Sequence, residues 1–269
     1  MAAIEFKNVS FAFDEHVVLD DLSFSVETGA TNLLLGASGA GKSVVLKLIL
    51  GLLRPDGGSI FVNGQRVDTL TEGELLRMRT DIGIAFQENA LFDSLTVAEN
   101  VGYRLYEETD MPLEQVRQRV EEVLAFIGLT ETIDRMPSAL SGGQRRRVGI
   151  ARAMTSRPKL LLFDDPTTGL DPIVASTVDD EIVKLRDLEH VTSIIATHQI
   201  RDAFYVATHN ARRTGERIEI LEEPDSGVAS ATFMVLHNGR MHFQGSAAEL
   251  LTSKDEYLRE FLFMTLPPW

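Results

Sequence analysis

Apolar and polar residues alternate over much of the first 30 positions, a pattern typical of β-strands with one buried face. The alternation is visible in 4–13, which reads IEFKNVSFAF, and in the second half of 17–26, where Leu22, Phe24 and Val26 are separated by polar residues. The chain is therefore predicted to begin with an antiparallel β region.

Short runs that are apolar almost throughout follow at 31–35, 159–165 and 192–198. Strands buried on both faces have this character, and they occur in parallel sheets whose faces are covered by helices. Helical segments are expected over 44–53, after the first run, and around 174–188, between the last two. The pattern predicts an α/β fold with a mostly parallel sheet.

The apolar spacing changes between about 96 and 154 to the three- and four-residue period of helices. It is clearest over 114–129, which starts soon after Pro112 and has Gly128 near its end. Residues 58–86 have instead the short apolar runs and turns of strands. We predict one domain, 1–269, with a core formed by 1–87 and 155–245, a helical subdomain at 88–154 and a C-terminal extension at 246–269.

The segment 211–230 is charged and poor in aromatic residues. We expect it to be an irregular, exposed insertion before a last hairpin at 232–245. A short helix is predicted in the tail, which ends at Trp269. The sequence predicts no role for the insertion or for the tail.

The charge and composition narrow the classes of partner. The net charge is −14 and the pI is near 4.9, which argues against nucleic acid, because its phosphates require a basic surface. The absence of cysteine excludes disulfides and thiolate metal sites. The first ten residues do not resemble a signal peptide, and 44–53, the longest apolar stretch, is too short to span a bilayer. We expect a soluble, cytoplasmic protein without direct membrane insertion.

A glycine-rich loop, GASGAGKS, joins the apolar run 31–35 to the helix predicted at 44–53. Its spacing fits G-x-x-x-x-G-K-[ST], in which backbone N–H groups and the next helix N-terminus bind phosphate oxygens. Lys42 is expected to reach the β- and γ-phosphates, and Ser43 to bind Mg²⁺. A chance match is the alternative, but the flanking strand and helix argue against it. The predicted site comprises Gly36, Ala37, Ser38, Gly39, Ala40, Gly41, Lys42, Ser43 and Val44.

Two aspartates, Asp164 and Asp165, end the buried run 159–165. In enzymes with such a phosphate loop, an aspartate at this place holds Mg²⁺, and the next residue can polarise the attacking water. Turn or helix-capping aspartates before Pro166 are the alternative. Because the phosphate loop lies upstream, we predict Asp164 as a metal ligand and Asp165 as a catalytic residue.

Residues 140–144, LSGGQ, open a basic helix. Ser141 followed by Gln144 is also a capping box, which is the local alternative. Together with the phosphate loop and the acidic pair, however, LSGGQ resembles the signature motif of ABC ATPases, the nucleotide-binding subunits of ABC transporters. The resemblance implies a P-loop NTPase core of the RecA-like type, with ATP and Mg²⁺ as its ligands and ATP hydrolysis coupled to transport.

Four further residues occur in the order in which this family places its functional groups. Phe13 stands where an aromatic ring stacks on adenine, and a core aromatic is the alternative. Gln87 matches the glutamine that senses Mg²⁺ and the γ-phosphate, and His198 the switch histidine that contacts the γ-phosphate. Asp171, in GLDP, matches the acid of the D-loop.

The resemblance also implies a homodimer in which two copies meet head to tail around ATP. Each ATP is then held between the phosphate loop of one copy and the LSGGQ of the other. Ser141, Gly142 and Gly143 would donate to the γ-phosphate in trans, helped by the helix dipole, and Gln144 belongs to the same site.

Asp165 departs from the family pattern, which has glutamate as the presumed general base. Aspartate is one methylene shorter, and a displacement of ~1 Å can lower a rate ~10²-fold. We therefore expect slow but real hydrolysis. Gln199 and Val44 depart as well, from an acid and from a hydroxyl residue, but neither removes a necessary ligand.

The segment after Gln87, NALFDSLTVAENV, is expected to carry the surface that receives transmembrane permease subunits, over 88–100. Exposed Leu91, Phe92 and Leu95 would form its groove, and ordinary core packing is the alternative. This segment and the EFLF of the tail are similar to the ATPases of Mla/Mce-type lipid transporters, although methionine and amino-acid importers share the T-V-x-E-N-V pattern.

The predicted function is therefore the ATPase subunit of a transporter, with phospholipid as the cargo that the finer resemblance implies, on the cytoplasmic face of the inner membrane. Two alternatives stay open. One is a soluble ABC ATPase of a non-transport assembly machine, and the other is a nucleotide-gated dimerisation module that hydrolyses slowly because of Asp165. The cargo itself, the direction of transport and the identity of the permease are not predicted.

Overall fold

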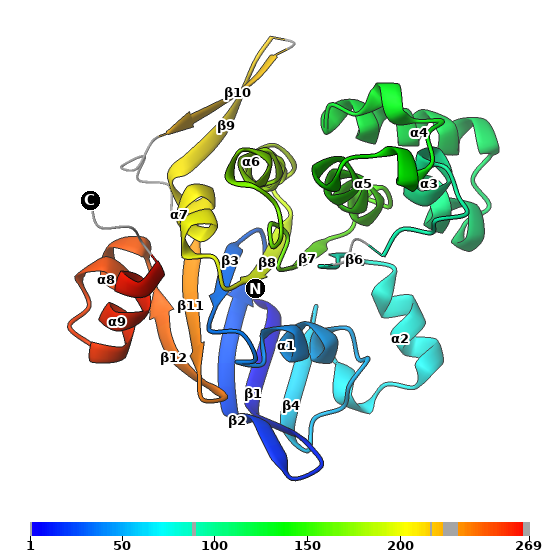
Figure 1. Ribbon diagram of the computed structural model, residues 1–269. Coiled ribbons are helices and arrows are strands. Elements are labelled where there is room, and N and C mark those ends of the chain that lie inside the picture. The colour runs from blue at the N-terminus through cyan, green and yellow to red at the C-terminus, as the bar shows by residue number, and fades with distance from the viewer. Residues whose placement is uncertain (1, 88–89, 216, 223–230, 266–269) are drawn as a thin grey trace.

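The computed structural model describes residues 2–87, 90–215, 217–222 and 231–265 (Figure 1). Its largest sheet has six strands, and all neighbours in it are parallel except for the antiparallel edge strand β12. The α/β fold with a mostly parallel sheet is thus confirmed. The strands are, in spatial order, β12 (Arg240–Gly245), β11 (Thr232–His237), β3 (Thr31–Leu35), β8 (Thr192–Thr197), β7 (Leu160–Asp164) and β6 (Ile82–Ala85).

A second, antiparallel sheet contains the start of the chain, as the alternating pattern predicts. The rings of Phe6 and Phe24 stack across its first two strands, with centroids 4.5 Å apart. Helix α1 (Lys42–Ile49) contacts both sheets. The strands are β2 (His16–Glu27), β1 (Ala2–Phe13), β4 (Gly57–Val62) and β5 (Gln65–Arg66).

Two hydrophobic clusters lie on opposite faces of the large sheet. Leu34 belongs to the cluster shared with α1 and the antiparallel sheet, whereas Leu33 and Leu35 belong to the cluster beneath the helices. This division follows from the alternation of side chains along a strand. Burial on both faces explains why the central strands are apolar throughout.

The other face of the large sheet carries α6 (Pro172–Glu189) and α7 (Ile200–Thr208), with α5 (Gly142–Met154) beside them (Figure 1). Helices α3 (Val97–Glu108) and α4 (Leu113–Phe126) pack with α5 and lie, with it, between β6 and β7 in the chain. The division of the chain at 88 and 154 stays a prediction. Short 3₁₀ turns occur at Val67–Thr69, Thr130–Thr132 and Pro137–Ala139.

Helix α2 (Glu72–Arg79) was not expected from the strand-like segment 58–86. It has a capping box, in which the Glu74 carboxylate accepts the Thr71 backbone N–H at 2.8 Å. The helix predicted at 44–53 ends earlier, at Ile49, because the chain turns at Gly51, whose φ is 64°.

The expectation of irregular structure after position 211 is wrong for the described part of that segment. Strands β9 (His209–Thr214) and β10 (Arg217–Glu222) form a separate hairpin. Helix α6 fixes its base, because Arg186 donates to the His209 carbonyl at 2.6 Å and Asp187 accepts the Ala211 N–H at 2.7 Å. Residues 223–230 lie outside the described part.

Helices α8 (Ala247–Thr252) and α9 (Glu256–Thr265) follow β12 and cover the edge of the large sheet. Leu258 and Leu262 of α9 are buried in the cluster beneath the helices. Trp269 lies outside the described residues. No helix in the described ranges has the length and apolar character needed to cross a membrane.

Candidate active site

The predicted residues follow three neighbouring strands of the large sheet. The phosphate loop follows β3, Asp164 ends β7 and Asp165 comes directly after it, and His198 follows β8, which lies between the other two strands. Because the strands are parallel, their carboxyl ends meet at one edge of the sheet, where open α/β sheets bind ligands.

The phosphate loop closes tightly on its neighbours. A Cβ on Gly36 would lie 2.7 Å from the Leu236 carbonyl oxygen, and one on Gly41 would lie 3.0 Å from a Leu19 methyl group. Gly41 has φ 99° and precedes α1 without a side-chain cap. The first backbone N–H groups of α1 therefore have no side-chain acceptor, which leaves them available to an anion.

Lys42 is folded into its own loop. Its side chain is buried, with 5% of the residue exposed, and Nζ donates to the carbonyl oxygens of Gly36 and Ala37 at 2.9 and 3.1 Å. Burial lowers the pKa of Lys42, and the charges of Asp165 and Asp164 oppose that shift. The ammonium group thus stands within the loop before any phosphate arrives.

Ser43 and Asp164, the two predicted metal ligands, are in direct contact. The Ser43 hydroxyl donates to Asp164 Oδ1 at 2.8 Å. Burial raises the pKa of Asp164; Asp165 adds to the rise, and the Ser43 hydrogen bond opposes it. A hydroxyl and a carboxylate are hard oxygen ligands of the kind that suit Mg²⁺. Within the described ranges, no three His, Cys, Asp or Glu side chains gather to hold a metal.

Asp165 is held against β8. Its Oδ1 accepts the backbone N–H of His198 at 3.2 Å and lies 2.7 Å from the imidazole Nδ1. Its own N–H donates to the Ala196 carbonyl at 2.8 Å, and its backbone is left-handed, with φ 44°. The shorter carboxylate is therefore engaged with the histidine.

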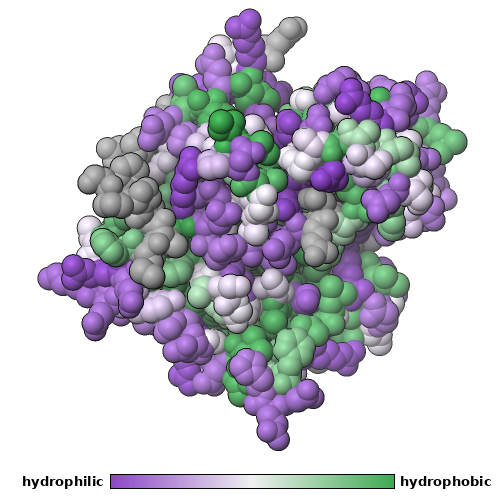
Figure 2. Space-filling view, in the orientation of Figure 1, coloured by the Kyte–Doolittle hydropathy of each residue, from purple (hydrophilic) through white to green (hydrophobic). Residues whose placement is uncertain are grey.

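Gln87 follows β6, the strand next to β7 in the large sheet, and Phe13 ends β1 of the antiparallel sheet. Phe13 is 49% exposed and packs edge-on against Phe11, so it is no core aromatic. Figure 2 shows apolar residues gathered over the lower part of this view, where β1, β2 and β4 lie. Gln87 is exposed, and its carbonyl accepts a bond from Arg146, which sequence reasoning missed.

The signature residues cap α5. The Ser141 hydroxyl accepts the Gln144 N–H at 3.2 Å, and Gln144 Oε1 accepts the Ser141 N–H at 2.9 Å. The capping box is therefore present, yet Ser141 and Gly142 remain exposed. Gly143 is buried, because a Cβ there would lie 2.2 Å from Val174 Cγ1 on α6.

Asp171 caps α6 in the same region. Its Oδ1 accepts the N–H groups of Ile173 and Val174 at 3.1 Å. Lys42, Ser43, Asp164, Asp165 and His198 thus form one group around the phosphate loop, and 141–144 and Asp171 form a second group at the N-termini of α5 and α6.

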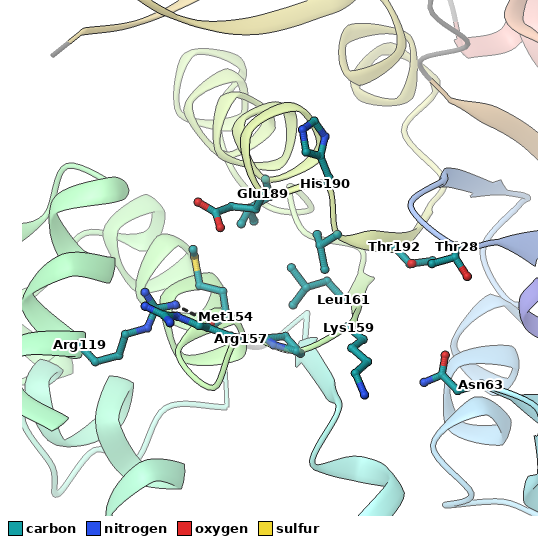
Figure 3. A pocket seen from close by; sticks show the side chains of 13 residues that line it. Thr28, Asn63, Arg119, Met154, Arg157, Lys159, Leu161, Glu189, His190 and Thr192 are labelled. Atoms are coloured by element: carbon teal, nitrogen blue, oxygen red, sulfur yellow. Dashed lines mark hydrogen bonds between the residues drawn. The ribbon is translucent and has the colours of Figure 1, made fainter. Parts of the chain in front are cut away.

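A cavity of about 360 Å³ lies at the opposite, amino ends of β7 and β8 (Figure 3). Its wall includes Arg119, Lys159 and His190, none of which the motifs single out. Arg119 is committed to the carbonyl oxygens of Thr155 and Met154, at 3.0 and 3.3 Å.

Comparison with known proteins agrees with this geometry. The family described as ABC transporter matches residues 19–168. The intermembrane phospholipid transport system ATP-binding protein MlaF of Haemophilus influenzae is 37% identical over 77% of this chain and 78% of its own length. The methionine import ATP-binding protein MetN of Symbiobacterium thermophilum is 36% identical over 97% of this chain and 72% of its own.

A solved structure has the same fold over almost the whole chain. The dimeric post-hydrolysis state of the ATP-binding cassette MJ0796, bound to ADP and Pi, has a TM-score of 0.74 and 27% identity, and the match covers 90% of this chain and 98% of that one. The chain therefore belongs to the ABC transporter family and is one of its ATPase subunits.

Proposed function

We propose that this chain hydrolyses Mg·ATP as a homodimer and so drives a phospholipid transporter from the cytoplasmic face of the membrane. The carrying observation is the single cluster at the carboxyl ends of β3, β7 and β8. There a buried lysine, a serine–aspartate pair and an aspartate–histidine pair surround an uncapped helix N-terminus. This combination suits a triphosphate with a hard cation.

One set of residues binds the nucleotide and its metal. The triphosphate occupies the loop 36–44, where its charge replaces the carbonyl oxygens now bound by Lys42. Ser43 and Asp164 would hold Mg²⁺, which would neutralise phosphate charge, and Gln87, which follows β6, would be a further contact of the metal and the γ-phosphate. Phe13, already exposed, stacks on adenine.

The hydrolytic roles fall to Asp165 and His198. The Asp165 carboxylate fixes the imidazole through Nδ1, which leaves Nε2 to contact the γ-phosphate. Asp165 is also the carboxylate that accepts a proton from the attacking water, but its bond to His198 and its short side chain hold it back from the phosphate. Turnover is slow because the Asp165 carboxylate is poorly placed to accept the proton of the attacking water.

A second copy completes each site. Ser141 and Gly142 are exposed at the N-terminus of α5, where the helix dipole favours an anion. One chain therefore offers 141–144 and Asp171 to the ATP bound by its partner. Hydrolysis weakens the dimer because the bridging γ-phosphate is lost.

A groove suited to a permease lies beside this site. A cavity of about 540 Å³ runs between α2, β6 and α3, with Leu76, Phe92 and Tyr103 in its wall. Phe92 is 42% exposed, and its ring is 4.7 Å from that of Tyr103. Buried Asn100 fixes this segment through both backbone groups of Phe92.

Only part of the predicted groove sequence is exposed in it. Leu91 packs partly buried against the core, so the core-packing alternative applies to that residue. Residues 88 and 89, also in the predicted permease region, lie outside the described part of the chain. An apolar groove of this size suits a short amphipathic element of a permease.

Phospholipid as the cargo is supported by the similarity to MlaF, whose name states that it serves intermembrane phospholipid transport. MetN, named for methionine import, is almost as similar. The segment after Gln87 and the EFLF of the tail favour lipid.

We expect Asp165→Glu to raise the steady-state ATPase rate several-fold, because the longer side chain reaches the water that Asp165 approaches only poorly. Asp165→Asn, which keeps the size and removes the charge, should lower the rate further while ATP still binds. Phosphate release at saturating ATP measures both. An unchanged or lower rate in Asp165→Glu would show that side-chain length does not limit catalysis.

Gly142→Ala and Gly143→Ala should separate dimerisation from folding. A Cβ on Gly142 would meet only Leu170, at 3.6 Å, so this variant should fold normally and lose ATP-driven dimerisation in the Asp165→Asn background. Gly143→Ala crowds Val174 and should lower the free energy of unfolding by ~1–3 kcal/mol. Light scattering with ATP and urea denaturation measure these effects. Normal dimers of Gly142→Ala would argue against the trans site.

Phe92→Ala together with Tyr103→Ala should abolish binding of the permease without changing the ATPase rate of the isolated chain. Leu113→Ala, at an equally apolar but exposed position outside the groove, is the matched control. Co-purification of detergent-solubilised permease with tagged chain measures binding. Retained binding in the double variant would show that the permease binds at a different surface of the chain.

The proposed function as a whole is tested by reconstituting the chain with its co-purified membrane partner in proteoliposomes. We expect phospholipid to stimulate ATP hydrolysis and methionine to have no effect. Stimulation by methionine alone would overturn the lipid assignment. If no membrane protein co-purifies, the chain belongs to a non-transport machine, and an absence of turnover would indicate the dimerisation module.

A further inference from the structure

Arg146, on α5, lies where three functional segments meet. Its Nη1 donates to the carbonyl oxygens of Phe86, at 3.2 Å, and of Gln87. Its Nη2 donates to the Thr168 carbonyl at 3.0 Å. One side chain thus joins the signature helix to the segment after β6 and to the loop after β7.

Burying the charge of Arg146 costs free energy of desolvation, which a purely structural contact would not require. Arg146 is 6% exposed, and the guanidinium donates within the described residues to backbone carbonyl oxygens rather than to a carboxylate. Its Nε is buried without a hydrogen-bond partner. Burial lowers the pKa of Arg146, and the charge of Asp165 opposes that shift. An apolar side chain would fill the same space without desolvating a charge.

The three bonded segments are those that the proposed function uses. Gln87 contacts the metal and the γ-phosphate, and Thr168 lies between Asp165 and Asp171 in the loop after β7. Helix α5, which carries Arg146, begins at the signature residues. A planar guanidinium can donate to all three carbonyl oxygens at once, whereas the point-like ammonium of lysine has no such fixed geometry.

A second arginine of α5 contacts residues a few positions further along the chain. Arg152 donates to the Ala90 carbonyl at 2.7 Å and lies over the Phe92 ring, 5.9 Å from its centroid. It is also part of the wall of the groove that contains Phe92. Displacement of Phe86 and Gln87, or of Ala90 and Phe92, therefore acts on α5 at one of two points.

We propose that Arg146 is a positioning residue for ATP hydrolysis, which ties Gln87, the loop 165–171 and the signature helix into one moving unit. When Gln87 engages the nucleotide, Arg146 carries the displacement to Asp165 in the same chain and to the signature residues offered to the partner. This inference rests on the proposed ATPase site, but not on the cargo.

The test compares Arg146→Lys and Arg146→Gln with Arg117→Gln, which removes an exposed positive charge from α4. Each purified chain is assayed alone for kcat, KM, Mg·ATP binding to the monomer and thermal unfolding. We expect both Arg146 variants to lose about 10-fold or more in kcat, with KM and monomer binding within about two-fold of wild type. Arg117→Gln should behave as wild type.

An unchanged kcat in both Arg146 variants would overturn the proposal. So would a loss of kcat that is accompanied by an equal loss of ATP binding and of unfolding temperature, or unfolding of both variants, because Arg146 would then be a structural residue. Full activity of Arg146→Lys would show that charge alone suffices and would refute the three-carbonyl geometry. A wild-type chain that hydrolyses ATP without response to phospholipid would remove the lipid assignment and leave this test intact.

Discussion

The parallel pairing of β3, β8 and β7 is the constraint on which the active site depends. Each strand is buried on both faces, so its register is fixed by two hydrophobic clusters at once. A slip of one residue would exchange the side chains between the clusters. The pairing of Leu35 with Thr197 and of Asp164 with Ala196 therefore sets where the phosphate loop, Asp165 and His198 meet.

Burial disfavours the charged forms of two groups in the active site. Burial moves the pKa of Lys42 down and that of Asp164 up, so both groups are shifted toward their neutral forms. A triphosphate would favour the ammonium, and a cation would favour the carboxylate. Binding of the nucleotide and its metal would therefore stabilise the charged forms of Lys42 and Asp164, which the folded chain already holds in position.

How much of this could be predicted from the sequence depends on whether a signal is local. The phosphate loop, the acidic pair and the capping of α5 by Ser141 are encoded within a few residues, and their positions on strands and helices follow from apolar runs. Helix α2 also had a local signal, the Thr71–Glu74 capping box, but it buries only Leu75 and Met78, too few residues for a clear helical period.

Other features depend on partners that are distant in the chain, and no local pattern encodes them. The hairpin β9–β10 is charged along both strands and is held by Arg186 and Asp187 of α6. The contact of Asp165 with His198 spans 33 residues and exists because β7 and β8 are neighbours in the sheet. Arg146 is one of three consecutive arginines in a basic helix, and the local sequence does not distinguish it from its neighbours, although the fold buries it.

The absence of a side chain at Gly143 has a consequence beyond packing. Val174 fills the space that a Cβ would take, so the first turns of α5 and α6, which carry Gly143 and Val174, are in contact. In a homodimer of the proposed kind, Ser141 and Asp171 both belong to the partner's ATP site. A change at Gly143 would therefore disturb the signature residues and Asp171 together, and its effect would be felt at the ATP site of the other copy.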